Sequence, residues 1–356
     1  MSCEEAENHR VALKCRYCWE PLTEPSIAHE AAFSDVCRSA ECIEKMHKSC
    51  AKIHRCGHKC RGFRGEKRCL PCLNKECIAT HNETYVDFQL YEDYSEEDYC
   101  GICMISGLGD EPSIILGCKH IFHVECIRKR VFGRWPSPRI TWDFLDCSAC
   151  KQVIDIQPDH VELHTELTKL LEMKAKVYSM SVERAKHEGI DKDPRLKDPN
   201  DNYYNDLQKW ALFKLAYYPC FKCKMPYFGG MKDCIAAQQA QQEFKPEDLV
   251  CGKCSAQQLG LGSANCKTHG TDFIEFKCKF CCSISQWFCW GNTHFCEPCH
   301  KRQCAGDYVS RKKISELPQC PGKSACPLKV EHPPNGNEFS LGCAVCRNVV
   351  ENAKNF

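Results

Sequence analysis

Residues 287–300 read WFCWGNTHFCEPCH and contain three cysteines and two histidines within fourteen positions. Thiolates and imidazoles can bind metal ions, or they can act as nucleophile and base. Cys296 and Cys299 form a C-x2-C pair, which is typical of a structural zinc site, whereas Cys289 stands alone between bulky aromatic residues. The spacing therefore leaves Cys289 open as either a metal ligand or a nucleophile.

The chain has 356 residues, 34 cysteines and a formal net charge of +1. It contains no run of about 18 apolar residues, and its first residues lack the apolar core of a signal peptide. We therefore expect a soluble chain in the reducing cytoplasm, without membrane insertion. Zinc is the expected cofactor, because disulfides are opened in that compartment. The balanced charge lacks the basic excess typical of nucleic-acid binding, so no nucleic-acid partner is expected.

The middle of the chain contains eight paired ligands, enough for two tetrahedral zinc ions. Interleaving ligands one, two, five and six with three, four, seven and eight gives the cross-brace of a RING-H2 domain, which this stretch resembles. The eight ligands are Cys100, Cys103, Cys118, His120, His123, Cys126, Cys147 and Cys150. The resemblance implies binding of a ubiquitin-conjugating enzyme that carries ubiquitin.

Four residues are expected to contact that enzyme: Ile102, Trp142, Ser148 and Lys151. Ser148 stands where many RING domains have proline, and Lys151 stands where many have arginine. A lysine lacks the planar guanidinium fork that holds the charged enzyme in its reactive pose. Direct transfer of ubiquitin to a substrate lysine is therefore less expected.

The C-terminal block supplies sixteen ligands, which would close four zinc sites. They are Cys220, Cys223, Cys251, Cys254, Cys266, His269, Cys278, Cys281, Cys282, Cys296, Cys299, Cys320, Cys326, His332, Cys343 and Cys346. Cys234, Cys289 and Cys304 remain. Exchanging Cys282 for Cys289 keeps the count at sixteen, so counting alone does not select the free thiols.

The stretch from CGICM at residue 100 to the C-terminus resembles the end of the PAM/Highwire/Myc-binding-protein-2 family of ubiquitin ligases. The resemblance covers about the last 260 residues. It rests on RWPSPRIT, YYPCFKCKMPYFGG, CKTHGTDFIEFKCKFCCS, FCWGNTHFCEPCH, HPPNGNEF and LGCAVCRN. It implies a RING followed by a tandem-cysteine domain, which relays ubiquitin through two cysteines and esterifies it onto a hydroxyl, preferably that of threonine.

Three residues of this chain match the catalytic residues of that family. The upstream relay cysteine matches Cys234, in a mobile loop to which Gly229 and Gly230 would give freedom. The downstream esterifying cysteine matches Cys289, and the general base matches His300. These residue types suit the reaction, because thioester exchange needs a thiolate and a hydroxyl nucleophile needs a base.

The family's acceptor pocket is aromatic, and this chain departs from it. Phe295 is kept, Trp290 replaces a phenylalanine, and Gln303 stands where another phenylalanine is expected. The acceptor is therefore open between threonine, serine and another hydroxyl. Cys304 has no expected counterpart and is interpreted as a spare thiol.

The opposing interpretation assigns the same residues to structure. Cys234 would then be an exposed loop cysteine, and Cys289, His294 and His300 would form a fifth, irregular zinc site. Spacing alone does not decide between the two interpretations.

Residues 15–81 hold thirteen further candidate ligands, which would suit about three zinc ions. They are Cys15, Cys18, Cys37, Cys42, His47, Cys50, Cys56, His58, Cys60, Cys69, Cys72, Cys77 and His81. No pairing follows from their spacing. A structural spacer or a protein-binding module is expected here.

The sequence thus predicts an irregular α+β fold of small zinc-stapled modules. The expected parts are an N-terminal zinc-binding region (1–84), an acidic linker (85–99), a RING-H2 domain (100–151), a linker helix (159–188) and a tandem-cysteine relay domain (200–356). The predicted function is an E3 ubiquitin-protein ligase, whose partners are a ubiquitin-conjugating enzyme, ubiquitin and a protein substrate. The alternatives are a conventional RING ligase that transfers ubiquitin directly to lysine and a non-enzymatic zinc scaffold.

Overall fold

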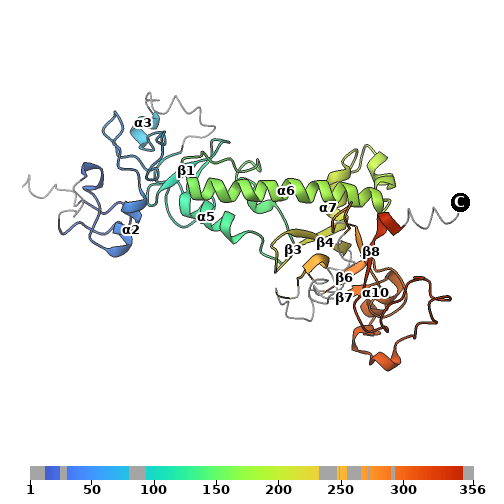
Figure 1. Ribbon diagram of the computed structural model, residues 1–356. Coiled ribbons are helices and arrows are strands. Elements are labelled where there is room, and N and C mark those ends of the chain that lie inside the picture. Colours follow the sequence, from blue (N-terminus) through green and yellow to red (C-terminus); the bar gives the residue numbers. More distant parts are fainter. Residues whose placement is uncertain are drawn as a thin grey trace, which may run out of the picture. The chain divides into compact units, whose positions relative to one another are not determined.

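The structure is a computed structural model that describes residues 13–24, 30–79, 94–231, 247, 249–254, 266–271, 273–289 and 293–347. The chain divides into two compact units, Met1–Pro136 with Thr141–Leu171, and Ser137–Ile140 with Glu172–Phe356. Short helices and strands alternate with loops around clustered cysteines, which confirms the predicted irregular α+β fold (Figure 1). Among the described helices, none combines the length and the apolar character needed to cross a membrane.

Within its described residues, the first unit contains short helices and a two-stranded sheet. Its elements are η1 (Ala31–Phe33), α2 (Ala40–Lys48), α3 (Lys75–Ala79), β1 (Ser113–Ile115), β2 (Ile121–His123), α5 (Val124–Gly133) and η2 (Asp143–Leu145). β1 pairs antiparallel with β2, and α5 follows β2 directly. Such short elements bury little apolar surface, so the cysteine clusters must supply much of the cohesion.

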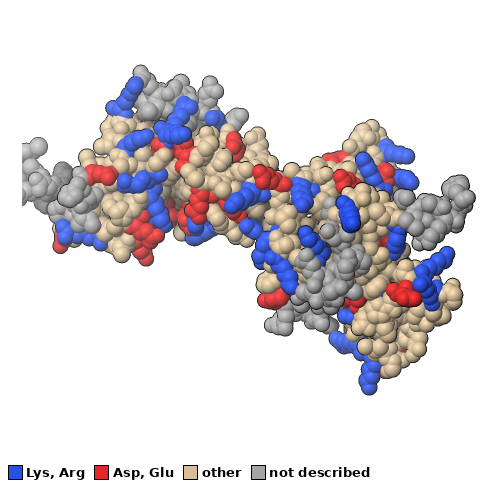
Figure 2. Space-filling model, in the orientation of Figure 1, with Lys and Arg blue, Asp and Glu red and all other residues tan. Residues whose placement is uncertain are grey.

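The N-terminal cysteine block contacts the RING-H2 module within this unit. The backbone carbonyl of Arg61 accepts from the N–H of Ser113 in this module at 2.8 Å, and the Arg61 side chain forms an ion pair at 2.6 Å with Glu96, just before the module. Trp19 Nε1–H donates to Asp110 Oδ1 at 2.8 Å. On the face shown in Figure 2, side chains of both charge signs are interspersed over this unit. Polar contacts, including ones between oppositely charged residues, therefore join the two cysteine-rich segments.

Helix α6 (Val161–His187) corresponds to the helix predicted over 159–188. Its apolar stripe is buried, and four residues of this stripe are all at most 3% exposed: Leu163, Leu167, Leu170 and Val177. Glu162 lies in the first turn, and Arg184 and Lys186 lie in the last turn, which complements the helix dipole. The stripe serves packing.

The second unit contains a four-stranded sheet in the order β3-β4-β6-β7 and a two-stranded sheet of β5 and β8. Its strands are β3 (Leu215–Pro219), β4 (Pro226–Met231), β5 (Ile274–Phe276), β6 (Trp287–Cys289), β7 (Thr293–Phe295) and β8 (Ser340–Cys343). Its helices are η3 (Ile190–Lys192), η4 (Pro194–Lys197), α7 (Leu207–Lys214), α10 (Glu297–Cys304), η7 (Val309–Arg311) and η8 (Ile314–Glu316). Neighbouring strands of the four-stranded sheet pair antiparallel.

The expectation that Gly229 and Gly230 give a loop its freedom is wrong, because both lie in β4. A Cβ at Gly229 would stand 2.3 Å from the Tyr218 ring, and one at Gly230 would stand 2.7 Å from the Phe288 amide nitrogen. Gly230 also has a φ of +116°, which L side chains rarely adopt. The glycines allow close approach of neighbouring strands, and Gly230 holds β4 against β6, which carries Cys289.

Candidate functional site

Cysteines and histidines converge in groups whose ligand atoms all lie within 4.8 Å of one another. Five such groups, each with four members, are Cys15/Cys18/Cys37/Cys42, Cys56/His58/Cys72/Cys77, Cys100/Cys103/His123/Cys126, Cys118/His120/Cys147/Cys150 and Cys220/Cys223/Cys251/Cys254, and further groups follow below. Zn–S bonds of about 2.3 Å put the sulfurs of a tetrahedral site about 3.8 Å apart. Sulfur separations of 3.7 Å (Cys18 to Cys37) and 3.8 Å (Cys223 to Cys251) match that edge, so these groups are positioned to bind zinc.

The middle block forms the interleaved arrangement of a RING-H2 cross-brace. His123 Nε2 bonds to the Gly107 carbonyl at 2.8 Å, which turns Nδ1 toward the sulfurs of Cys103 at 3.6 Å and Cys126 at 3.8 Å. A backbone carbonyl on the second ring nitrogen fixes the tautomer and orientation of a metal-binding histidine. The imidazole is therefore oriented to bind a metal ion through Nδ1.

The residues expected to contact a conjugating enzyme differ in exposure. Ile102 is half-buried and Lys151 is exposed, whereas Trp142 is 8% exposed and stacks on Phe144 within the module. Trp142 thus serves mainly as core. Ser148 accepts from Arg130 Nη1–H at 3.3 Å.

Two exposed apolar side chains in the same region escaped prediction from the sequence. Met104 is 71% exposed and Ile105 is 80% exposed, directly after the Cys100/Cys103 pair. The signal available in the sequence was their position, because apolar residues that follow a zinc knuckle have little core to enter. Together with Ile102 they present an apolar surface at the edge of the module.

Contacts among the remaining C-terminal ligands describe three more groups. In the first, Cys281 Sγ lies 3.4 Å from Cys296 Sγ and 3.7 Å from Cys299 Sγ, with Cys278 beside them. In the second, His269 Nδ1 lies 3.4 to 3.6 Å from the sulfurs of Cys266, Cys343 and Cys346. In the third, His332 Nε2 lies 3.5 Å from Cys320 Sγ and 3.3 Å from Cys326 Sγ.

The fourth member of the third group is Cys282, whose thiol contacts those of Cys320 and Cys326. Each of the four C-terminal groups thereby has four members without Cys289. The exchange of Cys282 for Cys289 that the ligand count allowed is therefore unnecessary. Cys289 is therefore not needed to complete any of these four sets, and it packs in the same buried cluster as Cys278, Cys296 and Cys299.

Cys289 is the last residue of β6, and the pairing of β6 with β7 decides which residues share its face. The register pairs Trp287 with Phe295, Phe288 with His294 and Cys289 with Thr293. Because side chains alternate along a strand, Trp287, Cys289 and Phe295 point to one face. Trp287 and Phe295 pack with Cys289 in one buried cluster, and Cys289 is only 3% exposed.

His294 points to the other face of the hairpin, away from Cys289. Its Nδ1 lies 2.6 Å from Glu338 Oε2, and its backbone N–H donates to Glu338 Oε1 at 3.1 Å. Its ring stacks on Phe276, with centroids 4.1 Å apart. Strand alternation thus argues against a zinc site that combines His294 with Cys289.

His300 lies on α10 and packs against the Cys289 face of the hairpin. Its ring stacks on Trp287 with centroids 4.5 Å apart and an interplanar angle of 17°, and it meets Phe295 edge-on at 6.0 Å. Trp287 is itself oriented by a bond from Nε1–H to Glu297 Oε2 at 2.6 Å. The indole therefore fixes the plane of the imidazole.

Cys304 lies one helical turn after His300, and its Sγ is 3.5 Å from His300 Nε2. The residue is exposed as a whole, but partial burial raises the pKa of its thiol, and the nearby Cys289 raises it further. The sequence interpretation of Cys304 as a spare thiol missed this proximity. Its position four residues after His300 on a helix was the signal that could have revealed it.

The predicted acceptor-pocket residues differ in their surroundings. Phe295 is fully buried, with its ring 4.8 Å from that of Phe280. Gln303 is half-buried, and its Oε1 accepts from Ser310 N–H at 3.0 Å, which holds the turn after α10. Trp290 and the predicted relay cysteine Cys234 lie outside the described residues.

No protein-family model matches the chain. The chain is similar to the protein named E3 ubiquitin-protein ligase MYCBP2 of Danio rerio, with 38% identity over 328 residues, which covers 89% of this chain and 7% of that protein. It is also similar to E3 ubiquitin-protein ligase highwire of Drosophila melanogaster, with 41% identity over 349 residues, 94% of this chain and 6% of that protein. The chain thus spans less than a tenth of the length of these relatives.

Proposed function

Because the chain belongs to the family of the MYCBP2 and Highwire proteins, we propose that it is an E3 ubiquitin-protein ligase region with a cysteine relay. It takes ubiquitin from a conjugating enzyme onto Cys234, passes it to Cys289 and esterifies it onto a threonine or serine hydroxyl of a protein substrate. The observation that carries this proposal is the placement of Cys289 outside the four-member ligand groups, on the face of β6 and β7 where His300 packs.

The RING-H2 module is the docking surface for the conjugating enzyme in this proposal. Ile102, Met104 and Ile105 supply exposed apolar area beside the first zinc cluster, and Lys151 adds a cation at the surface. Lys151 has a φ of +63° and donates through Nζ to the Ser148 carbonyl at 3.1 Å. An apolar patch with a charged rim is the composition of a transient protein interface.

The mechanism has three acyl transfers. In the first, the Cys234 thiolate attacks the thioester carbonyl carbon on the conjugating enzyme, a new C–S bond forms, and the thiolate of that enzyme leaves. In the second, the Cys289 thiolate attacks the carbonyl carbon of the thioester on Cys234, a new C–S bond forms, and the Cys234 thiolate leaves. In the third, the substrate hydroxyl attacks the Cys289 thioester while His300 takes its proton, the ester C–O bond forms, and the Cys289 thiolate leaves. The imidazole of His300 is held flat on Trp287, which restricts the direction from which it accepts the proton.

The burial of Cys289 sets a requirement for this mechanism. A side chain that is 3% exposed must be uncovered before its sulfur reaches a thioester carried by another residue. Exchange therefore includes a conformational step that uncovers Cys289.

Direct transfer from the conjugating enzyme to a substrate lysine is the second candidate function. The burial of Cys289 favours it, because a conventional RING ligase needs no accessible thiol. The exposed Met104 and Ile105 suit both candidates equally. The two functions differ in the covalent intermediate and in the bond that joins ubiquitin to its product.

The test incubates the chain with activating enzyme, conjugating enzyme, ubiquitin and ATP, and resolves ubiquitin adducts with and without thiol reductant. We expect a reductant-sensitive adduct on Cys289 that is lost, together with hydroxyl transfer, in Cys289→Ala and that persists in the matched variant Cys304→Ala. Products should be cleaved by hydroxylamine, as esters are. Undiminished, hydroxylamine-resistant ubiquitin transfer in both Cys234→Ala and Cys289→Ala would establish direct transfer instead.

A further inference from the structure

Three cysteines of the N-terminal block belong to neither of the two four-membered groups described for that block. Cys50, Cys60 and Cys69 come from three different segments, and the sulfurs of Cys50 and Cys69 lie 4.0 Å apart. Cys50 and Cys60 are 3% and 0% exposed. Three convergent thiols supply three corners of a tetrahedral site and leave one corner for another ligand.

The carboxylate of the buried residue Glu66 lies beside these thiols, where a fourth ligand would bind. Glu66 is 6% exposed, and its Oε1 lies 3.1 Å from Cys60 Sγ. Its side chain also contacts the thiol of Cys50. With Zn–S bonds of about 2.3 Å and Zn–O bonds of about 2.1 Å, a tetrahedral site has a sulfur–oxygen edge of about 3.6 Å. The sulfur–oxygen separation of 3.1 Å is about 0.5 Å shorter than that edge, and the sulfur–sulfur separation of 4.0 Å is about 0.2 Å longer than the sulfur–sulfur edge of about 3.8 Å.

The backbone around this group is built to admit the carboxylate. The atom nearest to an ideal Cβ at Gly62 is a carboxylate oxygen of Glu66, so a larger residue would displace the side chain. The Gly62 N–H donates to Cys60 Sγ at 3.3 Å, as amides do around metal-bound thiolates. The Cys50 N–H bonds to the Gly62 carbonyl at 2.9 Å, which ties the first ligand to the same turn.

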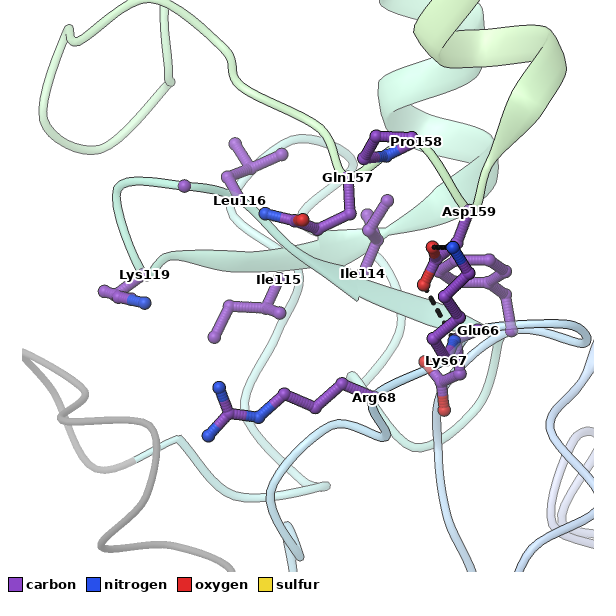
Figure 3. A pocket seen from close by; sticks show the side chains of 12 residues that line it. Glu66, Lys67, Arg68, Ile114, Ile115, Leu116, Lys119, Gln157, Pro158 and Asp159 are labelled. Carbon is purple, nitrogen blue, oxygen red and sulfur yellow. Dashed lines mark hydrogen bonds and ion pairs between the residues drawn. The ribbon is translucent and has the colours of Figure 1, made fainter.

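The loop that carries Glu66 is anchored on both sides. The next residue, Lys67, donates its backbone N–H to Asp159 Oδ2 at 2.7 Å, and Phe63 packs against His160 with ring centroids 5.0 Å apart. Figure 3 shows Glu66 and Lys67 beside Asp159 at the edge of a pocket that β1 also lines. The carboxylate is therefore positioned by the segment that follows the RING-H2 module.

We propose that Cys50, Cys60, Cys69 and Glu66 bind a zinc ion as a Cys3-carboxylate site. Thiolates and a carboxylate are all anionic in their ligand forms, and burying them together is favourable only around a cation. Three soft sulfur ligands select zinc over the hard cations that prefer oxygen. The site adds to the proposed ligase function and does not depend on it.

The site also gives the N-terminal block a physical connection to the segment between the RING-H2 module and α6. One ligand, Glu66, is adjacent in sequence to the residue bound by Asp159, and Asp159 shortly precedes the first turn of α6. Metal binding would therefore fix the loop from Phe63 to Arg68 against that segment. Loss of the metal is expected to loosen the contact without touching the cross-brace ligands.

The test measures zinc content and the rate of zinc release to a chromogenic chelator for the full chain and four variants. Glu66→Ala should lose one ion or release it at least about tenfold faster, because even outer-shell partners of metal ligands change affinity by 10- to 100-fold. Glu66→Cys should keep the ion and release it more slowly, which shows a ligand role even where Glu66→Ala fails to fold. Glu44→Ala, an exposed glutamate on α2, is the matched control and should behave as the parent chain.

The fourth variant tests the competing ligand. His81 lies outside the described residues and is a candidate from the sequence. An unchanged zinc content and release rate in both Glu66→Ala and Glu66→Cys, with loss of one ion in His81→Ala, would overturn the proposal. Substitution of cobalt for zinc adds an independent readout. The sulfur-to-cobalt charge-transfer absorption increases with the number of thiolate ligands, so Glu66→Cys should increase it by the contribution of one thiolate.

Discussion

The first zinc cluster of the RING-H2 module and the Cys289 site use the same two side chains, thiol and imidazole, in different surroundings. In the cluster, a backbone carbonyl turns the His123 ring toward several sulfurs. At the Cys289 site, the His300 ring stacks on Trp287 and lies beside Cys304. Cys289 is the last residue of β6. The difference teaches that four converging ligand atoms make a metal site, whereas the thiol and imidazole on the aromatic wall are not joined in such a set among the described residues and serve acyl transfer in the proposed relay.

The largest effect is expected from breaking the metal side of the comparison. His123→Ala removes one of four ligands, and structural zinc sites have apparent binding free energies of roughly 10–16 kcal/mol. We expect loss of at least one zinc ion and of the cooperative unfolding of the module, measured by metal analysis and thermal denaturation. An unchanged zinc content would contradict the cross-brace.

The catalytic side is tested by Cys289→Ser, which keeps the size of the side chain. Zinc content and thermal stability should remain those of the parent chain, because Cys289 is not needed to complete the four C-terminal groups. Transfer of ubiquitin to hydroxyl acceptors should fall on the order of 10³-fold or more, since nucleophile removal has effects of that size or larger. Loss of a zinc ion in this variant would show that Cys289 is a metal ligand.

The role of the stacked imidazole is tested by His300→Gln. A general base contributes roughly 10²- to 10⁴-fold, so esterification should fall by that factor while the thioester on Cys289 accumulates. Single-turnover assays that follow the adduct and the ester separately provide the measurement. Equal loss of adduct and ester would assign His300 a purely structural role on Trp287.

The sheet that carries Cys289 depends on a glycine in the neighbouring strand. Gly230→Ala places a Cβ against the Phe288 amide at a φ of +116°, and we expect a destabilisation of about 1–3 kcal/mol, measured by denaturant unfolding. Gly133→Ala is the matched control, because no atom lies within 4 Å of its added Cβ. Equal stability of the two variants would show that the close approach of β4 and β6 is dispensable.

The smallest effect concerns the electrostatic contact between Cys289 and Cys304. Burial raises the pKa of the Cys304 thiol first, and the charge of Cys289 adds to it. Because a neighbouring negative charge disfavours the thiolate, Cys289→Ala should move the alkylation profile of Cys304 to lower pH. The measurement is the alkylation rate of Cys304 as a function of pH, followed by mass spectrometry. An unchanged profile in Cys289→Ala would show that the charge of Cys289 does not affect the Cys304 thiol.

The ligand pairs that lie close together in the chain were predictable from the sequence. Residues three apart, such as Cys100 and Cys103 or Cys278 and Cys281, place both sulfurs on one side of a tight turn, so the spacing itself forms half of a tetrahedron. The helix over 161–187 was equally accessible, because its leucines repeat at helical spacing and its ends carry start signals and favourable charges. Both features depend on residues close together in the chain.

The closure of each site was decided only by the tertiary structure. Cys266 meets Cys346 across 80 residues at 3.4 Å, and Cys282 takes a ligand position that Cys289 could equally have filled on count alone. The register of β6 and β7 turned His294 away from Cys289, and the fold brought Glu66, an acidic residue outside any paired ligand spacing, to three convergent thiols.

The sequence by itself thus determined the chemistry available to this protein: paired zinc ligands, a cysteine outside any C-x2-C pair in an aromatic stretch, and a histidine directly after such a pair. The tertiary structure decided which of these groups meet. The physical reason is that ligand spacing constrains only a few bonds of backbone, whereas site closure depends on strand register and on packing between segments far apart in the chain.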